Sequence, residues 1–307
     1  MQSKEIVKYL ENVRLGRNIT QSEFIEDIVS SRQYHRYLNG ESQIAFPTLE
    51  KFAEKLGLST RKLITEIERK KHDQNKTVSM FHNAVANQDH AKEEELEKTL
   101  RHMNILDEDT RLFYEFAKTL SRFYKATLSK SEVTERIKTL IHYPDILKQD
   151  YLTDIEMLVM SSLIDFLPRD KHTPIVVRLM VYYENEDLIM SGGNEMIHPV
   201  ILMRLAKAYG IKNNMDKVLE LSDIALKRGR MYKQTYLFYI FYYFRALAYF
   251  KKDMTSPFEE NLYRCYCALE TTKNPERFQK YKTMIEKDFN IDFIKFITKT
   301  IRKRHLN

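Results

Sequence analysis

Apolar residues along most of this chain recur at intervals of three and four positions, and strict alternation is rare. Such intervals place apolar side chains on one face of an α-helix. Only 7 Gly and 7 Pro interrupt the pattern across 307 residues, and these residue types most often end helices. The pattern therefore predicts an all-α protein without a substantial sheet.

The first 67 residues are expected to form a compact module of five helices. Pro47 suits the first turn of a helix, and Ser59 belongs to the residue types that cap one. Gly57 lies between them and is expected to end the earlier helix. The expected helices cover residues 4–15, two short stretches within 20–40, 47–56 and 59–67.

Residues 20–40, TQSEFIEDIVSSRQYHRYLNG, have the spacing of two short helices joined by a tight turn. Thr20 followed by Glu23 predicts a capping box at the start of the first helix. Ser30 can cap the second helix, and Gly40 can end it. This arrangement predicts a helix-turn-helix, whose second helix lies in the major groove of DNA.

The second helix of this pair is expected to have one apolar and one polar face. Tyr34, Tyr37 and Leu38 share the inward face. The outward face carries side chains suited to bases, because arginine offers two donors to guanine and glutamine can pair with adenine. The outward residues are Ser31, Arg32, Gln33, His35 and Arg36.

Residues 68–77 are almost wholly polar and indicate either a linker or the exposed end of the fifth helix. Apolar periodicity resumes after them, so residues 78–307 are expected to form a second domain. Residues 92–98, KEEELEK, predict a solvated helix face there.

Two stretches of the second domain, 204–226 and 245–269, each predict a helix, a polar turn and a helix. Their offset is about 40 residues, which indicates degenerate tetratricopeptide-like repeats. The segment 236–250 is apolar on nearly all sides and is expected to be an inner helix of the repeats.

Composition narrows the functional class. The net charge of +7 mildly favours an anionic partner such as DNA. Cys265 and Cys267 are two positions apart on an expected helix, where their side chains diverge and cannot form a disulfide without distortion. No nucleophile, base or metal-ligand set has the required spacing, so we expect no enzyme, no metal and no cofactor. A cytoplasmic protein is expected, because no leader follows Met1 and segment 236–250 is too short to span a bilayer.

The motifs TQSEF, VSSRQYHRY, the closing NG and FPTLEKFAEKLGL together resemble a Cro/repressor-type (XRE) DNA-binding domain over residues 1–67. With its helical repeats, the whole chain resembles the Rgg, PlcR and PrgX group of peptide-responsive transcription regulators of Gram-positive bacteria. The resemblance implies a homodimer that binds a double-stranded DNA operator and a short intracellular signalling peptide in quorum sensing.

By position in the motif, the resemblance implies that Gln21 contacts a phosphate, that Ser31, Arg32, Gln33 and His35 face the bases, and that Arg36 serves in either role. For the peptide, the repeat helices offer side chains with an apolar body and polar reach, although core packing is an alternative role for the two tyrosines. These candidates are Arg204, Tyr239, Tyr243 and Arg245.

Two other functions fit the same sequence. One is a plasmid- or phage-type repressor that needs no peptide and uses its second domain only to oligomerise. The other is an interaction scaffold whose repeats bind a protein. A preference for one operator over random duplex distinguishes a regulator from a scaffold.

Overall fold

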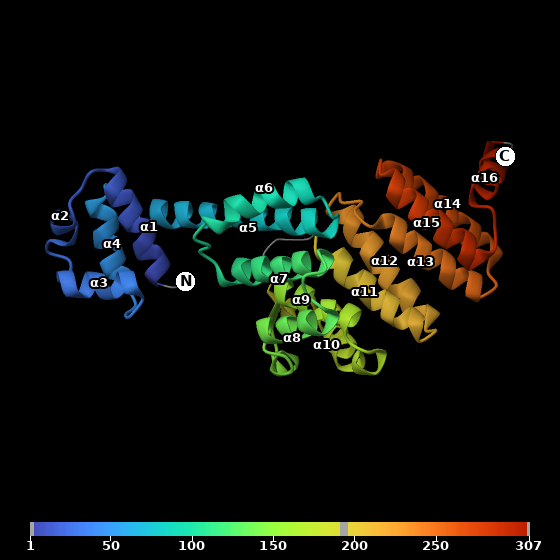
Figure 1. Cartoon of the computed structure of the whole chain (residues 1–307), viewed down its shortest axis with the longest axis horizontal. Helices are drawn as coiled ribbons and strands as arrows, with labels where there is room; N and C mark the ends of the chain where they lie inside the picture. Colours follow the sequence, from blue (N-terminus) through green and yellow to red (C-terminus); the bar gives the residue numbers. More distant parts are fainter. Residues whose placement is uncertain (1–2, 191–195, 306–307) are drawn as a thin grey trace. The chain divides into compact units, whose positions relative to one another are not determined.

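The structure is a computed structural model that describes residues 3–190 and 196–305, and it divides into two compact units, residues 1–129 and 130–307 (Figure 1). Most of the described residues are helical, which confirms the all-α prediction. The described residues include one sheet, a parallel pair of two-residue strands, β1 (Leu152–Thr153) and β2 (Ile189–Met190).

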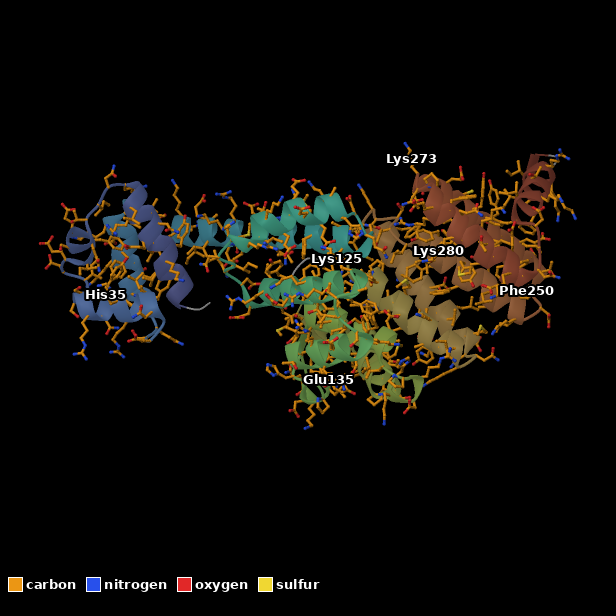
Figure 2. All side chains as sticks on the ribbon, viewed as in Figure 1. His35, Lys125, Glu135, Phe250, Lys273 and Lys280 are labelled. Carbon is orange, nitrogen blue, oxygen red and sulfur yellow. The ribbon has the colours of Figure 1, made fainter. Side chains whose placement is uncertain are left out.

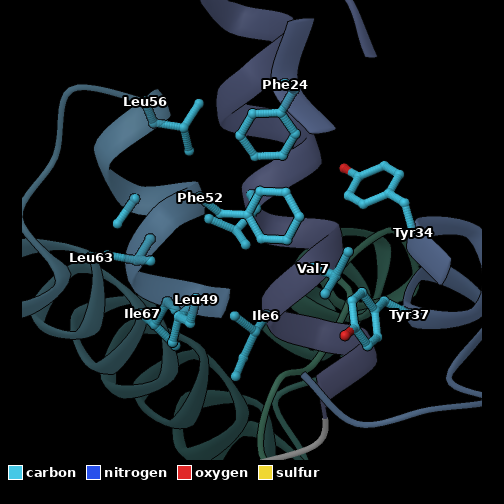
Figure 3. Close-up of a cluster of buried hydrophobic side chains, with 12 residues drawn as sticks. Ile6, Val7, Phe24, Tyr34, Tyr37, Leu49, Phe52, Leu56, Leu63 and Ile67 are labelled. Atoms are coloured by element: carbon cyan, nitrogen blue, oxygen red, sulfur yellow. The ribbon is translucent and has the colours of Figure 1, made fainter. Parts of the chain in front are cut away.

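The first unit begins with the expected five-helix module. Its helices are α1 (Ser3–Gly16), α2 (Gln21–Ile25), α3 (Ser31–Asn39), α4 (Phe46–Lys55) and the first part of α5 (Thr60–Ala86). Their apolar faces meet in one core, drawn in Figure 3, in which Phe24, Phe52 and Leu63 have no exposed surface. We call this module the head; its core ends with Ile67 of α5.

Residues 68–77 differ from the expected linker, because they form the middle of α5, which continues unbroken to Ala86. Ion pairs at helical spacing join Arg69 to Glu66 and to Asp73, and such pairs support a polar helix. Further along α5, the ring of Phe81 packs 5.7 Å from that of Tyr114. One helix therefore contributes both to the head core and to the packing of the helices that follow.

Helices α6 (His90–Arg101) and α7 (Glu108–Tyr124) complete the first unit. The predicted solvated face at 92–98 is wrong at Glu93, which is only 2% exposed. Its carboxylate accepts hydrogen bonds from Ser121 and from Lys125. Burial acts to raise the pKa of Glu93, but these two donors hold it below its ordinary value.

The second unit starts with three helices, α8 (Lys130–Leu140), α9 (Asp154–Phe166) and α10 (Thr173–Glu184), and with the two short strands. Helix α9 is buried along nearly its whole length. Three short 3-10 turns, at 145–148, 169–171 and 186–188, connect these elements.

Three helical hairpins follow, and the internal echo predicted the first two of them. They are α11 (His198–Ile211) with α12 (Met215–Met231), α13 (Phe238–Lys251) with α14 (Thr255–Thr271), and α15 (Pro275–Phe289) with α16 (Phe293–His305). Ala248 of α13 packs with Met215 and Val218 of α12 and with Tyr209 of α11. Small and aromatic side chains thus interlock neighbouring hairpins.

Gly229 of α12 permits the close approach of α13. A Cβ atom at this position would lie 2.6 Å from the carbonyl oxygen of Gln234 and would also overlap the ring of Phe238. Gly229→Ala should therefore destabilise the second unit by about 1–3 kcal/mol, although alanine favours helices. Thermal unfolding followed by circular dichroism measures the loss.

Gly210→Ala is the matched control for that variant. Gly210 lies in α11 of the same unit, and an added Cβ there would meet only Val218, at an ordinary 3.6 Å. An equal melting temperature for the two variants would contradict the steric explanation.

No helix among the described residues is long and apolar enough to cross a membrane. Both cysteines are free thiols; Cys265 is buried and donates to the carbonyl oxygen of Tyr239, while Cys267 is exposed.

Candidate nucleic-acid interface and ligand pocket

Helix α3 of the head is capped at both ends, by a side chain at its start and by a glycine at its end. The Ser30 hydroxyl accepts a hydrogen bond from the backbone of Gln33 at 3.2 Å. Gly40 adopts the left-handed conformation (φ 80°), and its N–H donates to the carbonyls of Arg36 and Tyr37. The capping box of Thr20 and Glu23 is also present at the start of α2. The predicted caps at Thr20, Ser30 and Gly40 are therefore confirmed.

A buried polar group ties α3 to α1. Tyr34 has no exposed surface, and its hydroxyl donates to Glu11 Oε2 at 2.5 Å. Arg14 also donates to Glu11 and, in addition, to the backbone carbonyl of Ile19 just before α2. Charge-assisted bonds of this kind are stronger than neutral ones. The three side chains hold the second helix of the motif against the rest of the head.

The outward face of α3 carries four exposed candidates, among them His35, which is labelled in Figure 2. These are Ser31, Arg32, His35 and Arg36. Within the described part of the chain, neither Arg32 nor Arg36 forms an ion pair, whereas Arg14 of the head pairs with Glu11.

Two of the candidates are held by neighbours. Gln33 is half-buried, and its amide donates to the Ser42 hydroxyl at 2.8 Å. The amide of Gln21, at the start of α2, lies 3.4 Å from Nε2 of His35. Gln21 and His35 are thus brought together from two helices, whereas the amide of Gln33 is anchored to Ser42 through one of its two N–H groups.

The Glu11 carboxylate gives the head a defined acid response. The Arg14 hydrogen bond lowers the pKa of Glu11 most, burial opposes it, and the Tyr34 hydroxyl adds to the lowering. A depressed folded-state pKa stabilises the fold above the unfolded-state pKa, and this contribution is lost as the pH falls through the folded-state value.

Glu11→Gln should therefore destabilise the head by about 1–2 kcal/mol at pH 7, because the charged acceptor is lost. The difference from the unmodified protein should shrink as the pH falls below the ordinary glutamate range, since Glu11 then becomes protonated. Urea unfolding at pH 7, 5 and 3.5 checks this. A constant difference across the series would contradict the assignment.

The second unit contains an apolar pocket of about 490 Å³ between α11, α12, α13 and α15. Its walls are mainly aliphatic, methionine and aromatic side chains, and one lysine, Lys207, is among them. A concave apolar site with few polar groups is the usual form of a ligand site. The lining includes Met203, Ile211, Ile240, Phe244, Tyr281 and Met284.

Of the four residues predicted for peptide binding, only Tyr243 lines this pocket. It is 6% exposed, and its hydroxyl donates to Asp288 at 2.5 Å. Burial and that acceptor raise the pKa of Tyr243. Tyr239 is also buried and packs edge-on against Tyr281 at 4.9 Å, which fits the alternative of core packing.

The two predicted arginines are engaged in structural bonds. Arg204 is 9% exposed and donates to Asp165 and to the Ser161 hydroxyl of α9. Arg245 pairs with Asp223 and donates to Asn261 Oδ1 at 2.8 Å. Neither arginine lines the pocket. Their positions on the repeat helices were therefore not enough to identify the lining residues.

Sequence reasoning missed Lys207, the charged residue of the pocket. It follows Arg204 by three positions on α11, so the spacing placed both on one side of a helix. The sequence therefore placed Lys207 beside a predicted site residue, but only the packing of α13 and α15 against α11 shows that a pocket lies there.

Comparison with known proteins supports the identity of the head. Residues 10–63 match the family model described as helix-turn-helix. No curated protein matches the sequence.

Solved structures resemble the whole chain. ComR from S. thermophilus, in complex with DNA and its signalling peptide ComS, has a TM-score of 0.59 and 16% identity, over 92% of this chain and 99% of that chain. ComR from Streptococcus vestibularis, in complex with its signalling peptide XIP, has a TM-score of 0.58 and 16% identity, over 93% and 99%. PlcR from Bacillus thuringiensis, in complex with the peptide PapR7 and DNA, has a TM-score of 0.48 and 15% identity, over 92% and 99%.

The family match confirms the helix-turn-helix that the sequence predicted in the head, and the two ComR structures share the fold of this chain. ComR from Streptococcus vestibularis is described as a competence regulator.

Proposed function

We propose that this protein is a homodimeric, sequence-specific transcription regulator of the cytoplasm, whose DNA binding is controlled by a short intracellular peptide. The observation that carries the proposal is the helix-turn-helix of residues 10–63 joined to a helical-repeat unit with an apolar pocket. ComR, which has the same fold, is seen with DNA and a signalling peptide.

In the DNA complex, α3 lies in the major groove with its outward face on the bases. Arg32 and Arg36 offer two parallel donors to guanine, and Ser31 and His35 contact neighbouring base edges. Gln33 joins them through the second N–H and the carbonyl oxygen of its amide. Gln21 contacts a phosphate from the start of α2, where backbone N–H groups also favour an anion. Two heads are needed, because helix-turn-helix dimers bind paired half-sites about one helical turn or more apart.

The peptide binds in the pocket between α11, α13 and α15, with its apolar side chains against residues such as Ile240 and Phe244. Such contacts provide the buried apolar area that drives binding. A peptide regulates DNA binding only if it binds two arrangements of the protein with different affinities. Of the earlier peptide candidates, Tyr243 contacts it directly. Arg204, Tyr239 and Arg245 support the walls of the site.

Fluorescence anisotropy with duplex DNA from the upstream region of its own gene tests the proposal. We expect specific binding that exceeds binding to random duplex by at least about a thousandfold and weakens steeply with salt. A synthetic peptide encoded by a neighbouring short reading frame should change that affinity.

Each alternative gives a different result in the same experiment. Specific binding that no such peptide changes would favour the peptide-independent repressor. Equal affinity for the upstream fragment and for random duplex would exclude sequence-specific regulation and favour the interaction scaffold. Sedimentation equilibrium of the free protein tests the dimer.

A further inference from the structure

The lysine of the pocket belongs to a charge cluster on one wall. Lys207 of α11 lines the pocket, and its ammonium is 3.2 Å from Asp165 Oδ1 of α9. Its side chain is 53% exposed. An ammonium has three N–H donors, and Asp165 takes one of them, which leaves Lys207 able to bind a second acceptor.

Asp165 is shared by two cations. Its other oxygen, Oδ2, accepts from Arg204 Nε at 2.8 Å, and Arg204 also donates to the Ser161 hydroxyl at 3.0 Å. Arg204 is 9% exposed, whereas Lys207 remains open to solvent. The cluster therefore has two positive charges and one negative charge, and the surplus positive charge lies on the pocket side.

The other residues that line the pocket carry no charge. Tyr243 also lines the pocket, but its hydroxyl already donates a hydrogen bond to Asp288. The other walls are mainly apolar. Charge-assisted hydrogen bonds to a carboxylate are among the strong polar contacts in proteins, and apolar surroundings strengthen them.

We infer that Lys207 selects peptides that end in a free α-carboxylate next to an apolar C-terminal side chain. This inference rests on the proposed function and names the chemistry of its ligand. The C-terminal residue of a peptide presents its carboxylate and its side chain from the same Cα atom. It can therefore place the carboxylate on Lys207 and its side chain among Ala206, Gly210 and Ile240.

The network also explains why Lys207 can change partners at low cost. When its ammonium binds a ligand carboxylate, Asp165 keeps the hydrogen bond from the buried Arg204. A half-buried carboxylate such as Asp165 would be disfavoured if it lost its only partner. Arg204 thus acts as a positioning residue that keeps Asp165 ionised and in place.

The test uses three synthetic libraries of N-acetylated hexapeptides, with positions drawn from Leu, Phe, Val, Ser and Gly. The first ends in a free carboxylate, the second in a carboxamide, and the third in a carboxamide after an internal Glu. Peptides retained by the full-length protein are identified by mass spectrometry. The best one is then made in free-acid and amide forms for calorimetry.

We expect the free acid to bind at least about tenfold more tightly than its amide. In Lys207→Met this ratio should fall below about twofold, because the ammonium is gone. The matched control is Lys212→Met, since Lys212 follows the same helix, donates to the Thr173 hydroxyl and does not line the pocket. That control should keep the full ratio.

The outcomes separate this inference from the proposed function. Equal retention of free-acid and amide peptides would overturn the carboxylate selection and leave the peptide pocket standing. Retention of the internal-Glu library as strong as that of the free acids would overturn the assignment to the C-terminus. If none of the libraries is retained, peptide binding in this pocket is itself wrong.

Discussion

Phe52→Ala should destabilise the head by about 3–5 kcal/mol and abolish operator binding. Phe52 has no exposed surface, stacks on Phe24 with ring centroids 4.8 Å apart, and lies 5.8 Å from the ring of Tyr34 (Figure 3). These rings come from α4, α2 and α3, so the deletion leaves a cavity where the three helices meet. Because small modules have little stability to lose, a change of this size unfolds much of the population.

Hydrogen exchange of the α3 amides measures the effect on the head alone. The matched control is Phe46→Ala, because Phe46 belongs to the same helix and is 55% exposed. It should leave exchange and DNA affinity nearly unchanged. Native-like protection of α3 in Phe52→Ala would show that the aromatic cluster does not hold the recognition helix.

Arg32→Ala has the second-largest expected effect, a loss of about 1–3 kcal/mol in operator binding, or roughly 5- to 150-fold in Kd. Arg32 is exposed on the second position of α3, where a guanidinium can donate twice to a guanine. Losing a base contact should also relax sequence preference at one position of each half-site. Anisotropy with the operator and with single-base variants measures both effects.

Arg61→Ala is the control for that experiment. Arg61 is an exposed arginine of α5 in the same unit, and its removal takes away one positive charge without touching α3. It should change affinity for all duplexes alike and only slightly. If Arg32→Ala behaves in the same way, Arg32 is a phosphate contact and the base-recognition assignment is wrong.

Helix α5 belongs to two packing clusters of the first unit. Helix α5 contributes Leu63 and Ile67 to the head core, and its later residue Phe81 packs against Tyr114 of α7. The head core and the packing of α5 against α7 therefore share one continuous helix, with no flexible linker between them.

Local signals in the sequence determined the head. Its helices start at Thr20, Ser30 and Ser59 because these side chains accept hydrogen bonds from backbone N–H groups a few residues away. Gly40 ends α3 because it adopts a left-handed conformation at little cost. Such interactions join residues within one turn, so the sequence alone specifies them. The same holds for the spacing of three and four that predicted the helical hairpins.

Contacts between distant residues were decided only by the tertiary structure. Glu93 belongs to a polar run that predicts a solvated face, yet its side chain is buried. Its carboxylate accepts a hydrogen bond from Ser121 of α7 and pairs with Lys125, which directly follows α7. Arg204 was expected in the peptide site but faces Asp165, 39 positions earlier. The pocket depends on how α11, α12, α13 and α15 pack, and only that packing makes Lys207 one of its lining residues. Periodicity gives the face of each helix, whereas the partner of that face depends on packing that no local pattern contains.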